Sequence, residues 1–331
     1  MEHRPVRWGI LATGAIAATF TEDLARSPDA EVVAVGSRTE AAAKAFAERY
    51  GIPKAYGSWV ELAADEDVDV VYVATPHSAH YAAARLCLTA GRAVLCEKPL
   101  TLDAASSREL VDVARRRGVF LMEAMWARCN PTLRRVAELV HDGAIGEVTT
   151  IVADFGLAGP FAPTHRLRDP ALGGGGLLDL GIYPITLAHL LLGRPDEVKA
   201  WASLTPEGVD QNLAVIFGYA SGALASLTCG TVGASGTRAV ITGRAGRIEL
   251  GPPFFRPSTA TLVRDSSAPE DLLVPVAGHG YLPEIEEVHR CLRAGRVESE
   301  LVPHATTVEV MALMDDIRAA VGVAYPPVTT A

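Results

Sequence analysis

The chain has 331 residues, of which 49% are hydrophobic, so it is long enough to bury the cores of two ordinary domains. Its net charge of −9 and the absence of a Lys/Arg cluster interleaved with aromatic residues argue against nucleic acid as a partner. Five scattered cysteines without a CxxC pair argue against a disulfide framework and a zinc site, and they favour a reducing, cytoplasmic location. Apolar runs stay short of the roughly 20 residues that a membrane span requires, so no membrane partner is expected.

Strand-like and helix-like segments alternate over the first 125 residues. The predicted strands are Arg7–Leu11, Glu31–Gly36, Val68–Ala74, Ala93–Cys96 and Val119–Met125. The predicted helices are Ile16–Ser27, Thr39–Tyr50, His80–Ala90 and Asp103–Arg117. Glycines just past three of these helices mark their ends. A repeated βα unit predicts an α/β fold in which a doubly wound parallel sheet forms a dinucleotide-binding Rossmann domain over residues 1–125.

The pattern changes after Met125. Predicted helices cover Pro131–His141, Gly175–Leu192, Tyr281–Ala294 and His304–Val321. Predicted strands cover Glu147–Phe155, Glu197–Leu204, Asn212–Tyr219, Ala223–Thr231 and Arg238–Thr242. Because the later strands follow one another without helices, they predict a largely antiparallel open sheet in an α+β second domain over residues 126–331. The last helix is expected to pack back towards the first domain.

A nucleotide-binding turn is predicted between the first strand and the first helix. Its residues are Ala12, Thr13, Gly14, Ala15 and Ile16, followed by Ala17. A dinucleotide fold has G-x-G-x-x-G/A at this point, because glycine lets the backbone approach the pyrophosphate at the N-terminus of the helix. The middle glycine and the final alanine match this pattern, whereas Ala12 departs from it.

The second strand ends in Ser37 and Arg38, about 23 residues after Gly14. An acidic residue at this point would bind the ribose 2′-hydroxyl of NAD, whereas arginine accommodates the 2′-phosphate of NADP. The sequence therefore favours NADP(H) over NAD(H).

Two polar loops follow buried strands at the carboxyl edge of the predicted sheet, where ligands bind in such folds. One reads ATPHSAH, residues 74–80, and the other reads EKPL, residues 97–100. Lys98 would then stand beside the cofactor, while Pro99 ends the strand.

A second polar pair lies in the segment GGGGLLDLGIYP, residues 173–184. Asp179 and Tyr183 are four residues apart on a predicted helix, so they share one face. Burial without partners would cost roughly 1–3 kcal/mol for each, so they either bond to one another or face a cleft.

These motifs resemble the Gfo/Idh/MocA family of glucose-fructose oxidoreductases and inositol dehydrogenases, over Arg7 to Pro326. Tyr183 ends a D-x-G-x-Y segment, residues 179–183, where inositol dehydrogenases have His. In this respect the chain resembles one branch of the family, the dimeric dihydrodiol dehydrogenases and NADP-dependent D-xylose dehydrogenases. Three further segments carry the same resemblance: EAMWARCNP (123–131), PTHRLRDPALGGGG (163–176) and GHGYLPEIEEVHRCLRAG (278–295). It implies a GAPDH-like second domain whose open sheet commonly forms the interface of a homodimer or homotetramer.

The resemblance also implies roles for individual residues. Lys98, Asp179 and Tyr183 match the catalytic positions, and the Lys98–Pro99 bond is often cis in relatives. Cofactor contacts are implied for Thr75, Pro76, His77, His80 and Glu97, in addition to Ala12–Ile16, Ser37, Arg38 and Lys98. Substrate contacts are implied for Trp126, Arg128, His165 and Arg166. His77 departs from the family, because many relatives carry Asn there; no metal ligands are expected.

The expected reaction is hydride transfer between nicotinamide C4 and a secondary alcohol or hemiacetal carbon of a sugar, cyclitol or dihydrodiol. Tyr183 would take the hydroxyl proton if a nearby cation, Lys98, lowered its pKa from near 10. Alternatively Lys98 itself is the proton acceptor. Asp179 would orient Lys98 or bind a neighbouring substrate hydroxyl.

Two other functions stay open at this point. One is an NAD-dependent glycosidase of the same fold, which Ser37 and Arg38 disfavour because a phosphate-tolerant site suits an exchangeable cofactor. The other is a non-catalytic NADPH-binding sensor, which the joint presence of Lys98, Asp179 and Tyr183 disfavours.

Overall fold

The computed structural model describes residues 4–159, 161–264 and 267–326. Within these residues the chain divides into two compact units. The first unit contains residues 4–129 and 276–308, and the second contains the described residues between 130 and 275 together with 309–326.

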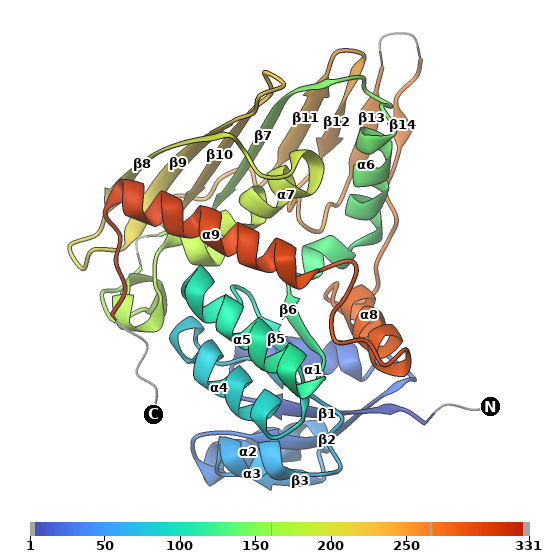
Figure 1. The fold of residues 1–331 in the computed structure, drawn as a ribbon, viewed down its shortest axis with the longest axis vertical. Helices are drawn as coiled ribbons and strands as arrows, with labels where there is room; N and C mark the ends of the chain where they lie inside the picture. The colour runs from blue at the N-terminus through green and yellow to red at the C-terminus, as the bar shows by residue number, and fades with distance from the viewer. Residues whose placement is uncertain (1–3, 160, 265–266, 327–331) are drawn as a thin grey trace. The chain divides into compact units, whose positions relative to one another are not determined.

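A six-stranded parallel sheet in the order β3-β2-β1-β4-β5-β6 forms the centre of the first unit (Figure 1). Its strands are β1 Val6–Leu11, β2 Ala30–Gly36, β3 Lys54–Tyr56, β4 Val70–Val73, β5 Ala93–Glu97 and β6 Leu121–Ala124. Its helices are α1 Ala15–Leu24, α2 Glu40–Tyr50, α3 Trp59–Ala64, α4 His77–Thr89 and α5 Ala104–Arg117. The predicted Rossmann fold is confirmed, although β3 and α3 were not predicted.

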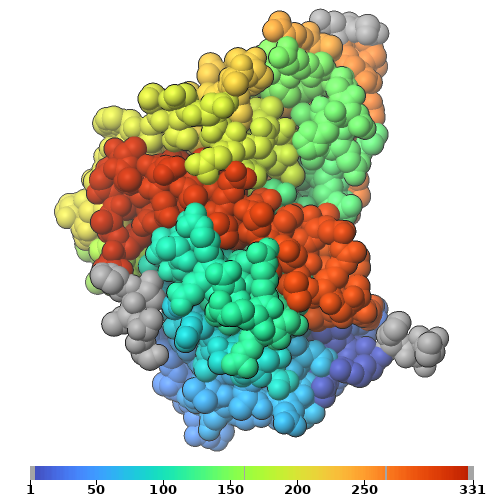
Figure 2. Space-filling model, in the orientation of Figure 1, coloured from blue at the N-terminus to red at the C-terminus, as the bar shows by residue number. Residues whose placement is uncertain are grey.

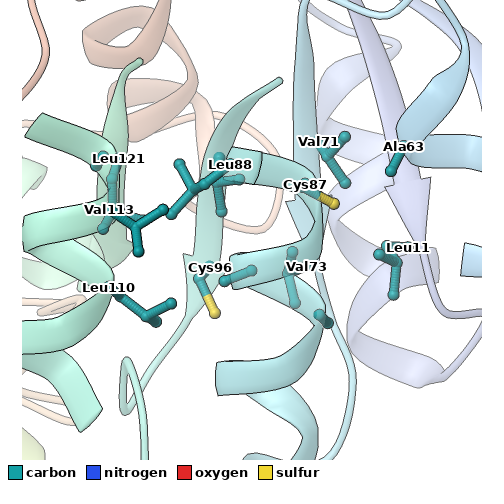
Figure 3. Packing of buried hydrophobic residues seen from close by; sticks show 14 of the residues in the cluster. Leu11, Ala63, Val71, Val73, Cys87, Leu88, Cys96, Leu110, Val113 and Leu121 are labelled. Atoms are coloured by element: carbon teal, nitrogen blue, oxygen red, sulfur yellow. The ribbon is translucent and has the colours of Figure 1, made fainter. Parts of the chain in front are cut away.

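The two faces of this sheet bury alternate residues of the same strands. Val71 and Val73 of β4 pack against α4 and α5 in the core cluster drawn in Figure 3. Tyr72 points to the other face, where its ring stacks on Phe20 of α1 at 3.8 Å between centroids. The outer sides of α4 and α5 form part of the surface of the first unit in Figure 2. Every residue of β4 is therefore buried, which is why the strand reads as a continuous apolar run.

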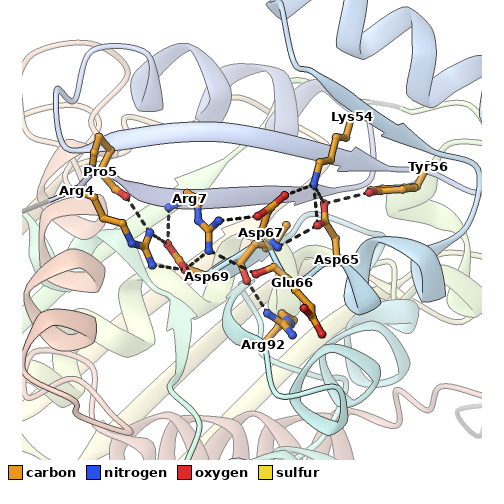
Figure 4. Close-up of polar contacts among 11 residues, drawn as sticks. Arg4, Pro5, Arg7, Lys54, Tyr56, Asp65, Glu66, Asp67, Asp69 and Arg92 are labelled. Atoms are coloured by element: carbon orange, nitrogen blue, oxygen red, sulfur yellow. Dashed lines mark hydrogen bonds and ion pairs between the residues drawn. The ribbon is translucent and has the colours of Figure 1, made fainter.

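An ion-pair network ties together the amino-terminal ends of β1 and β4, opposite the carboxyl edge (Figure 4). Asp69 accepts hydrogen bonds from Arg4 and Arg7, and Arg7 also donates to Asp67 at 2.8 Å. Lys54 bridges Asp67 and Asp65 at 2.6 and 2.9 Å. Because these groups satisfy one another, the charged residues of this edge have a structural explanation.

Residues 276–308 belong to the first unit, although the sequence placed them in the second domain. Helix α8, Leu282–Arg293, packs on α1 and on the short 3₁₀ helix η1, Trp126–Cys129. Leu121 of β6 donates its N–H to Val297 O at 3.1 Å and accepts from His304 Nε2 at 2.8 Å. The segment thus covers the edge strand β6, a long-range contact that local sequence patterns do not encode.

The second unit is built on an eight-stranded sheet in the order β14-β13-β12-β11-β7-β10-β9-β8. Its strands are β7 Val148–Gly156, β8 Glu197–Leu204, β9 Asp210–Gly218, β10 Leu224–Gly230, β11 Ala239–Gly243, β12 Gly246–Leu250, β13 Ala260–Val263 and β14 Glu270–Asp271. The neighbours are antiparallel, as predicted, except that β7 and β10 are parallel. The predicted fold class is confirmed, although β12, β13 and β14 were not predicted.

One face of this sheet is covered by helical segments. These are α6 Pro131–His141, the π-helical turn η4 Leu177–Gly181 and α7 Ile182–Leu192; the last helix of the chain is α9 His304–Val321. Both η4 and α7 contact β7 and β10. The stretch Pro170–Leu192 is long and apolar enough to cross a membrane, but 83% of its most apolar 18-residue window is buried, as expected for a helix in a protein core.

Candidate functional site

The candidate residues are divided between the two units, and each group is organised within its own unit. In the first unit they follow the carboxyl ends of β1, β2, β4, β5 and β6, which is the edge where parallel sheets bind ligands.

The turn after β1 keeps the backbone shape of a nucleotide-binding loop without its first glycine. Ala12 has φ of 93°, in the left-handed half of the map that side chains other than glycine rarely adopt, and its N–H bonds Gly36 O at 2.9 Å. Gly14 precedes α1, and a Cβ added there would meet no atom within 4 Å. Thr13, Ala15 and Ile16 are all at least partly exposed. The helix N-terminus is therefore open to an anion such as a pyrophosphate.

Ser37 and Arg38 lie directly after β2, as expected. Ser37 is buried and its N–H donates to Tyr56 O at 3.0 Å, whereas the side chain of Arg38 is exposed. Arg38 can therefore reach a ligand, while the backbone N–H of Ser37 makes the hydrogen bond to β3 that follows the last residue of β2.

The loop after β4 is tied to the loop after β5 by His80. Its ring is fully buried, with Nδ1 2.7 Å from Pro99 O and Nε2 2.9 Å from Thr75 O. Desolvation and the nearby His77 lower the pKa of His80 to about 3, so the ring is neutral near pH 7 and donates to one carbonyl at a time. His80 therefore holds the two loops together, and its predicted contact with the cofactor stays a prediction.

The same loop carries Thr75, Pro76 and His77. Thr75 is buried, and its Oγ1 has no hydrogen-bond partner among the described residues. Pro76 is exposed just before α4, and His77 is the first residue of that helix, 8% exposed.

Lys98 is held by a buried carboxyl group at the end of β5. Glu97 accepts the N–H of Lys98 at 3.1 Å and the hydroxyl of Tyr72, and the Lys98–Pro99 peptide bond is cis. Burial raises the pKa of Glu97, and attraction to Lys98 opposes that rise. Lys98 itself is half-buried, so its side chain leaves the sheet at a fixed point of the carboxyl edge.

Two further buried carboxyl groups of this region were missed by the sequence reasoning. Glu123 of β6 accepts hydrogen bonds from Leu100 N at 3.0 Å and Thr307 Oγ1 at 2.9 Å, and burial raises its pKa to about 7. Glu284 of α8 is fully buried, and its pKa is raised by desolvation and by repulsion from Glu97 and Asp23. For Glu123 the one local signal in the sequence is a glutamate inside an otherwise apolar strand.

Trp126 and Arg128, both predicted to contact substrate, lie in η1. Trp126 is 7% exposed and its ring centroid lies 5.0 Å from that of Tyr281. Arg128 donates from Nε to Leu301 O at 2.8 Å, and burial lowers its pKa. This backbone contact gives Arg128 a structural explanation within the first unit.

In the second unit Asp179 is paired with Arg166. Asp179 lies on η4 and is 7% exposed, and its Oδ2 is 3.0 Å from Arg166 Nη2, whose side chain is half-exposed. The sequence predicted both residues for the site but gave no reason to pair them. The segment was also predicted to be α-helical throughout. Residues Leu177–Gly181 instead form a π-helical turn, which is wider than an α-helical turn, so the predicted α-helical spacing of Asp179 and Tyr183 is changed.

Tyr183 lies against an aromatic wall. Its ring stacks on Phe255 at 4.4 Å and lies 5.7 Å from Phe155. His165, the remaining predicted substrate residue, stacks on Phe161 and accepts the N–H of Leu167 through Nδ1. It thus caps the short helix that carries Arg166.

In the described ranges, no group of three or more His, Cys, Asp or Glu side chains is arranged to hold a metal ion. All five cysteines are buried, and none of them forms a disulfide bond.

Comparisons with known proteins match both units to one enzyme family. The family model GFO_IDH_MocA, an oxidoreductase family with an NAD-binding Rossmann fold, matches residues 6–125, and the model of that family's C-terminal domain matches residues 133–249. Trans-1,2-dihydrobenzene-1,2-diol dehydrogenase from Bos taurus is 38% identical over 97% of this chain and 98% of that protein. D-xylose 1-dehydrogenase (NADP(+)) from Hypocrea jecorina is 36% identical over 98% of this chain and 94% of that protein.

Solved structures agree with this match. A 3-ketoreductase from Actinomadura kijaniata, in complex with NADP and TDP-benzene, superposes with a TM-score of 0.85 at 29% identity, covering 98% of this chain and all of that one. Aldose-aldose oxidoreductase from Caulobacter crescentus, complexed with glycerol, superposes with a TM-score of 0.86 at 26% identity, covering 96% of this chain and 97% of that one.

Proposed function

Because this chain belongs to the GFO/IDH/MocA oxidoreductase family, we propose that it is an NADP(H)-dependent dehydrogenase or reductase acting on a secondary alcohol or hemiacetal carbon of a sugar, cyclitol or dihydrodiol. The observation that carries this proposal is the fixed exit of Lys98 at the carboxyl edge of the Rossmann sheet, where the buried carboxyl group of Glu97 accepts the backbone N–H of Lys98 at 3.1 Å.

The cofactor preference rests on three features of the first unit. The N-terminus of α1 is open above Gly14, where the pyrophosphate would bind. Exposed Arg38 follows β2, where it would meet the 2′-phosphate of NADP. The names of the Hypocrea jecorina relative and the Actinomadura kijaniata structure support the same choice, because both include NADP.

When bound, NADP(H) supplies the hydride acceptor or donor. Tyr183 would take the proton of the substrate hydroxyl during oxidation and return it during reduction. Lys98 would favour the tyrosinate by its positive charge. Asp179, paired with Arg166, would bind a neighbouring substrate hydroxyl. The aromatic surface that Tyr183 forms with Phe155 and Phe255 would pack against the apolar side of the substrate ring.

Purified protein mixed with NADP+ or NAD+ and a panel of aldoses, inositols and trans-dihydrodiols tests the proposal by nicotinamide absorbance. We expect turnover with NADP+ that is lost in Lys98→Ala and reduced in Tyr183→Phe. Full turnover in Tyr183→Phe would mean that Lys98, and not Tyr183, is the proton acceptor. Binding of NADPH without turnover of any substrate in either direction would leave a sensor as the better description.

We also infer that the chain forms a dimer through the outer face of the second sheet. This face exposes apolar side chains on adjacent strands: Trp201 (71%), Val152 (52%), Leu224 (50%) and Ile216 (41%). A second copy related by two-fold symmetry would bury these side chains, because such an interface brings the same patch of both copies together. Light scattering of Trp201→Glu should give a smaller mass than wild type; equal masses contradict this assignment.

A reducing, cytoplasmic location is part of the same proposal. It is supported by five cysteines that form no disulfide bond and by the need for a nicotinamide pool.

A further inference from the structure

The turn that carries Asp179 is fixed from two sides. Four glycines, residues 173–176, lead into η4. On one side Gly174 N donates to Asp169 O at 3.0 Å and Gly175 N donates to Leu167 O at 2.8 Å. A Cβ at Gly174 would lie 2.7 Å from Arg166 O, so the glycine allows this close approach.

On the other side the turn rests on Asp210, a residue that the sequence analysis did not select. Asp210 begins β9, is 1% exposed, and accepts the N–H of Leu177 through Oδ2 at 2.7 Å. Its Oδ1 has no hydrogen-bond partner among the described residues and faces Gly175, where a Cβ would lie 2.3 Å away. Gly175 has φ of 106°, so its conformation also requires glycine. Asp210 and the turn are therefore fitted to one another.

The charge of Asp210 is sensitive to pH near neutrality. Burial raises its pKa to about 7, while the backbone N–H groups of Leu177 and Gly176 oppose the rise. Asp210 interacts electrostatically with three groups of neighbouring elements. Arg318 of α9 attracts the Asp210 carboxylate and lowers the pKa of Asp210. The carboxylate in turn raises the pKa of Cys229 on β10 and of Tyr325 near the C-terminus. Tyr325 also holds the turn directly, by donating its hydroxyl to Gly174 O at 2.6 Å.

We propose that Asp210 is a positioning residue for the reaction: it holds the turn that places Asp179 and Tyr183, and it does so more firmly as a carboxylate than as a carboxylic acid. An ionised acceptor makes the stronger hydrogen bond to an N–H group. It is also favoured at the start of a helix, where the backbone N–H groups carry partial positive charge. This inference rests on the proposed function, since it assigns Asp210 to the same reaction.

Asp210→Asn tests the proposal because the amide oxygen can still accept from Leu177 N, whereas the residue no longer titrates. We expect kcat above neutral pH to fall about tenfold, with KM changed less than about twofold, and we expect the rise of kcat across about pH 7 to be lost. Asp196→Asn is the matched control, because exposed Asp196 accepts a backbone N–H from Ala220 at 2.6 Å elsewhere in the same unit. A wild-type pH profile in Asp210→Asn overturns the proposal.

Hydrogen exchange separates this inference from the proposed reaction, because it needs no substrate. In the wild type the amide protection factors of residues 174–181 should rise from about pH 6 to about pH 8, and in Asp210→Asn they should not. Gly175→Ala, which pushes a Cβ against Oδ1, should lower the same protection factors at both pH values. Protection that is equal in wild type and both variants rejects the role of Asp210, whether or not a substrate is turned over.

Discussion

The guanidinium of Arg166 lies 3.0 Å from the carboxylate of Asp179, so two residues that the sequence selected independently form one ion pair. Arg166 is half-exposed and Asp179 is buried, which makes the arginine the adjustable partner. The pair therefore helps to set the direction of the Asp179 carboxylate within the second unit.

Arg166→Met should therefore lower kcat/KM by about tenfold, because it leaves a buried carboxylate without this partner. The matched control is Arg168→Met, because Arg168 lies in the same short helix as Arg166 but pairs with Glu207. We expect the control to lower the free energy of unfolding without lowering kcat/KM. Steady-state kinetics of both variants check this, and equal losses of kcat/KM would mean that the helix, not the pair, is what matters.

Ala12→Gly should raise the free energy of unfolding by about 1 kcal/mol. At φ of 93° the alanine side chain is strained, and relief of that strain outweighs the entropy that glycine adds to the unfolded chain. Ala15→Gly is the control, because Ala15 begins α1 and glycine in a helix destabilises. Urea unfolding of both variants measures the difference; a less stable Ala12→Gly protein is incompatible with the strain.

Glu284→Gln should be stabilised relative to wild type, and increasingly so as pH rises. The folded-state pKa of Glu284 is raised, so the folded protein keeps a proton that the unfolded chain loses above its ordinary pKa near 4.5. Wild-type stability thus contains a penalty that grows from that pH upwards by at most about 1.4 kcal/mol per pH unit. Glutamine does not titrate and escapes this penalty.

Urea unfolding at about pH 5 and about pH 8 measures this difference, and Glu286→Gln, an exposed neighbour on the same helix, is the control. An advantage of Glu284→Gln that is constant with pH would show that Glu284 is ionised in the folded protein.

Arg38→Ala should raise the KM for NADP+ by about tenfold and leave the KM for NAD+ unchanged, because only NADP carries the 2′-phosphate. Arg49→Ala, an exposed arginine on α2, should change neither constant. Initial rates with each cofactor at a saturating substrate concentration give the comparison. An equal effect on both cofactors would remove Arg38 from the phosphate site.

Features that depend on neighbours along the chain could be predicted from the sequence. Alternation of apolar and amphipathic runs located β1, β2, β4 and β5, and α6, β8 and α9 have the predicted bounds. The loop positions of Gly14, Arg38 and Lys98 follow from the same pattern, because a parallel sheet brings the carboxyl ends of its strands to one edge. Short or irregular elements such as β3 and β14 have too few residues for a periodicity to be recognised.

Which polar groups contact one another depends on how distant segments of the chain pack together. Asp210 lies 33 residues from Leu177, and Thr307 lies 184 residues from Glu123, so no local pattern links either pair. The sequence also could not place residues 276–308 in the first unit, nor set β7 and β10 parallel. Burial shifts a pKa and demands a hydrogen-bond partner only after distant segments have excluded water. The chemistry of a buried carboxyl group is therefore a property of the packed chain, whereas its position on a strand or turn is already present in the sequence.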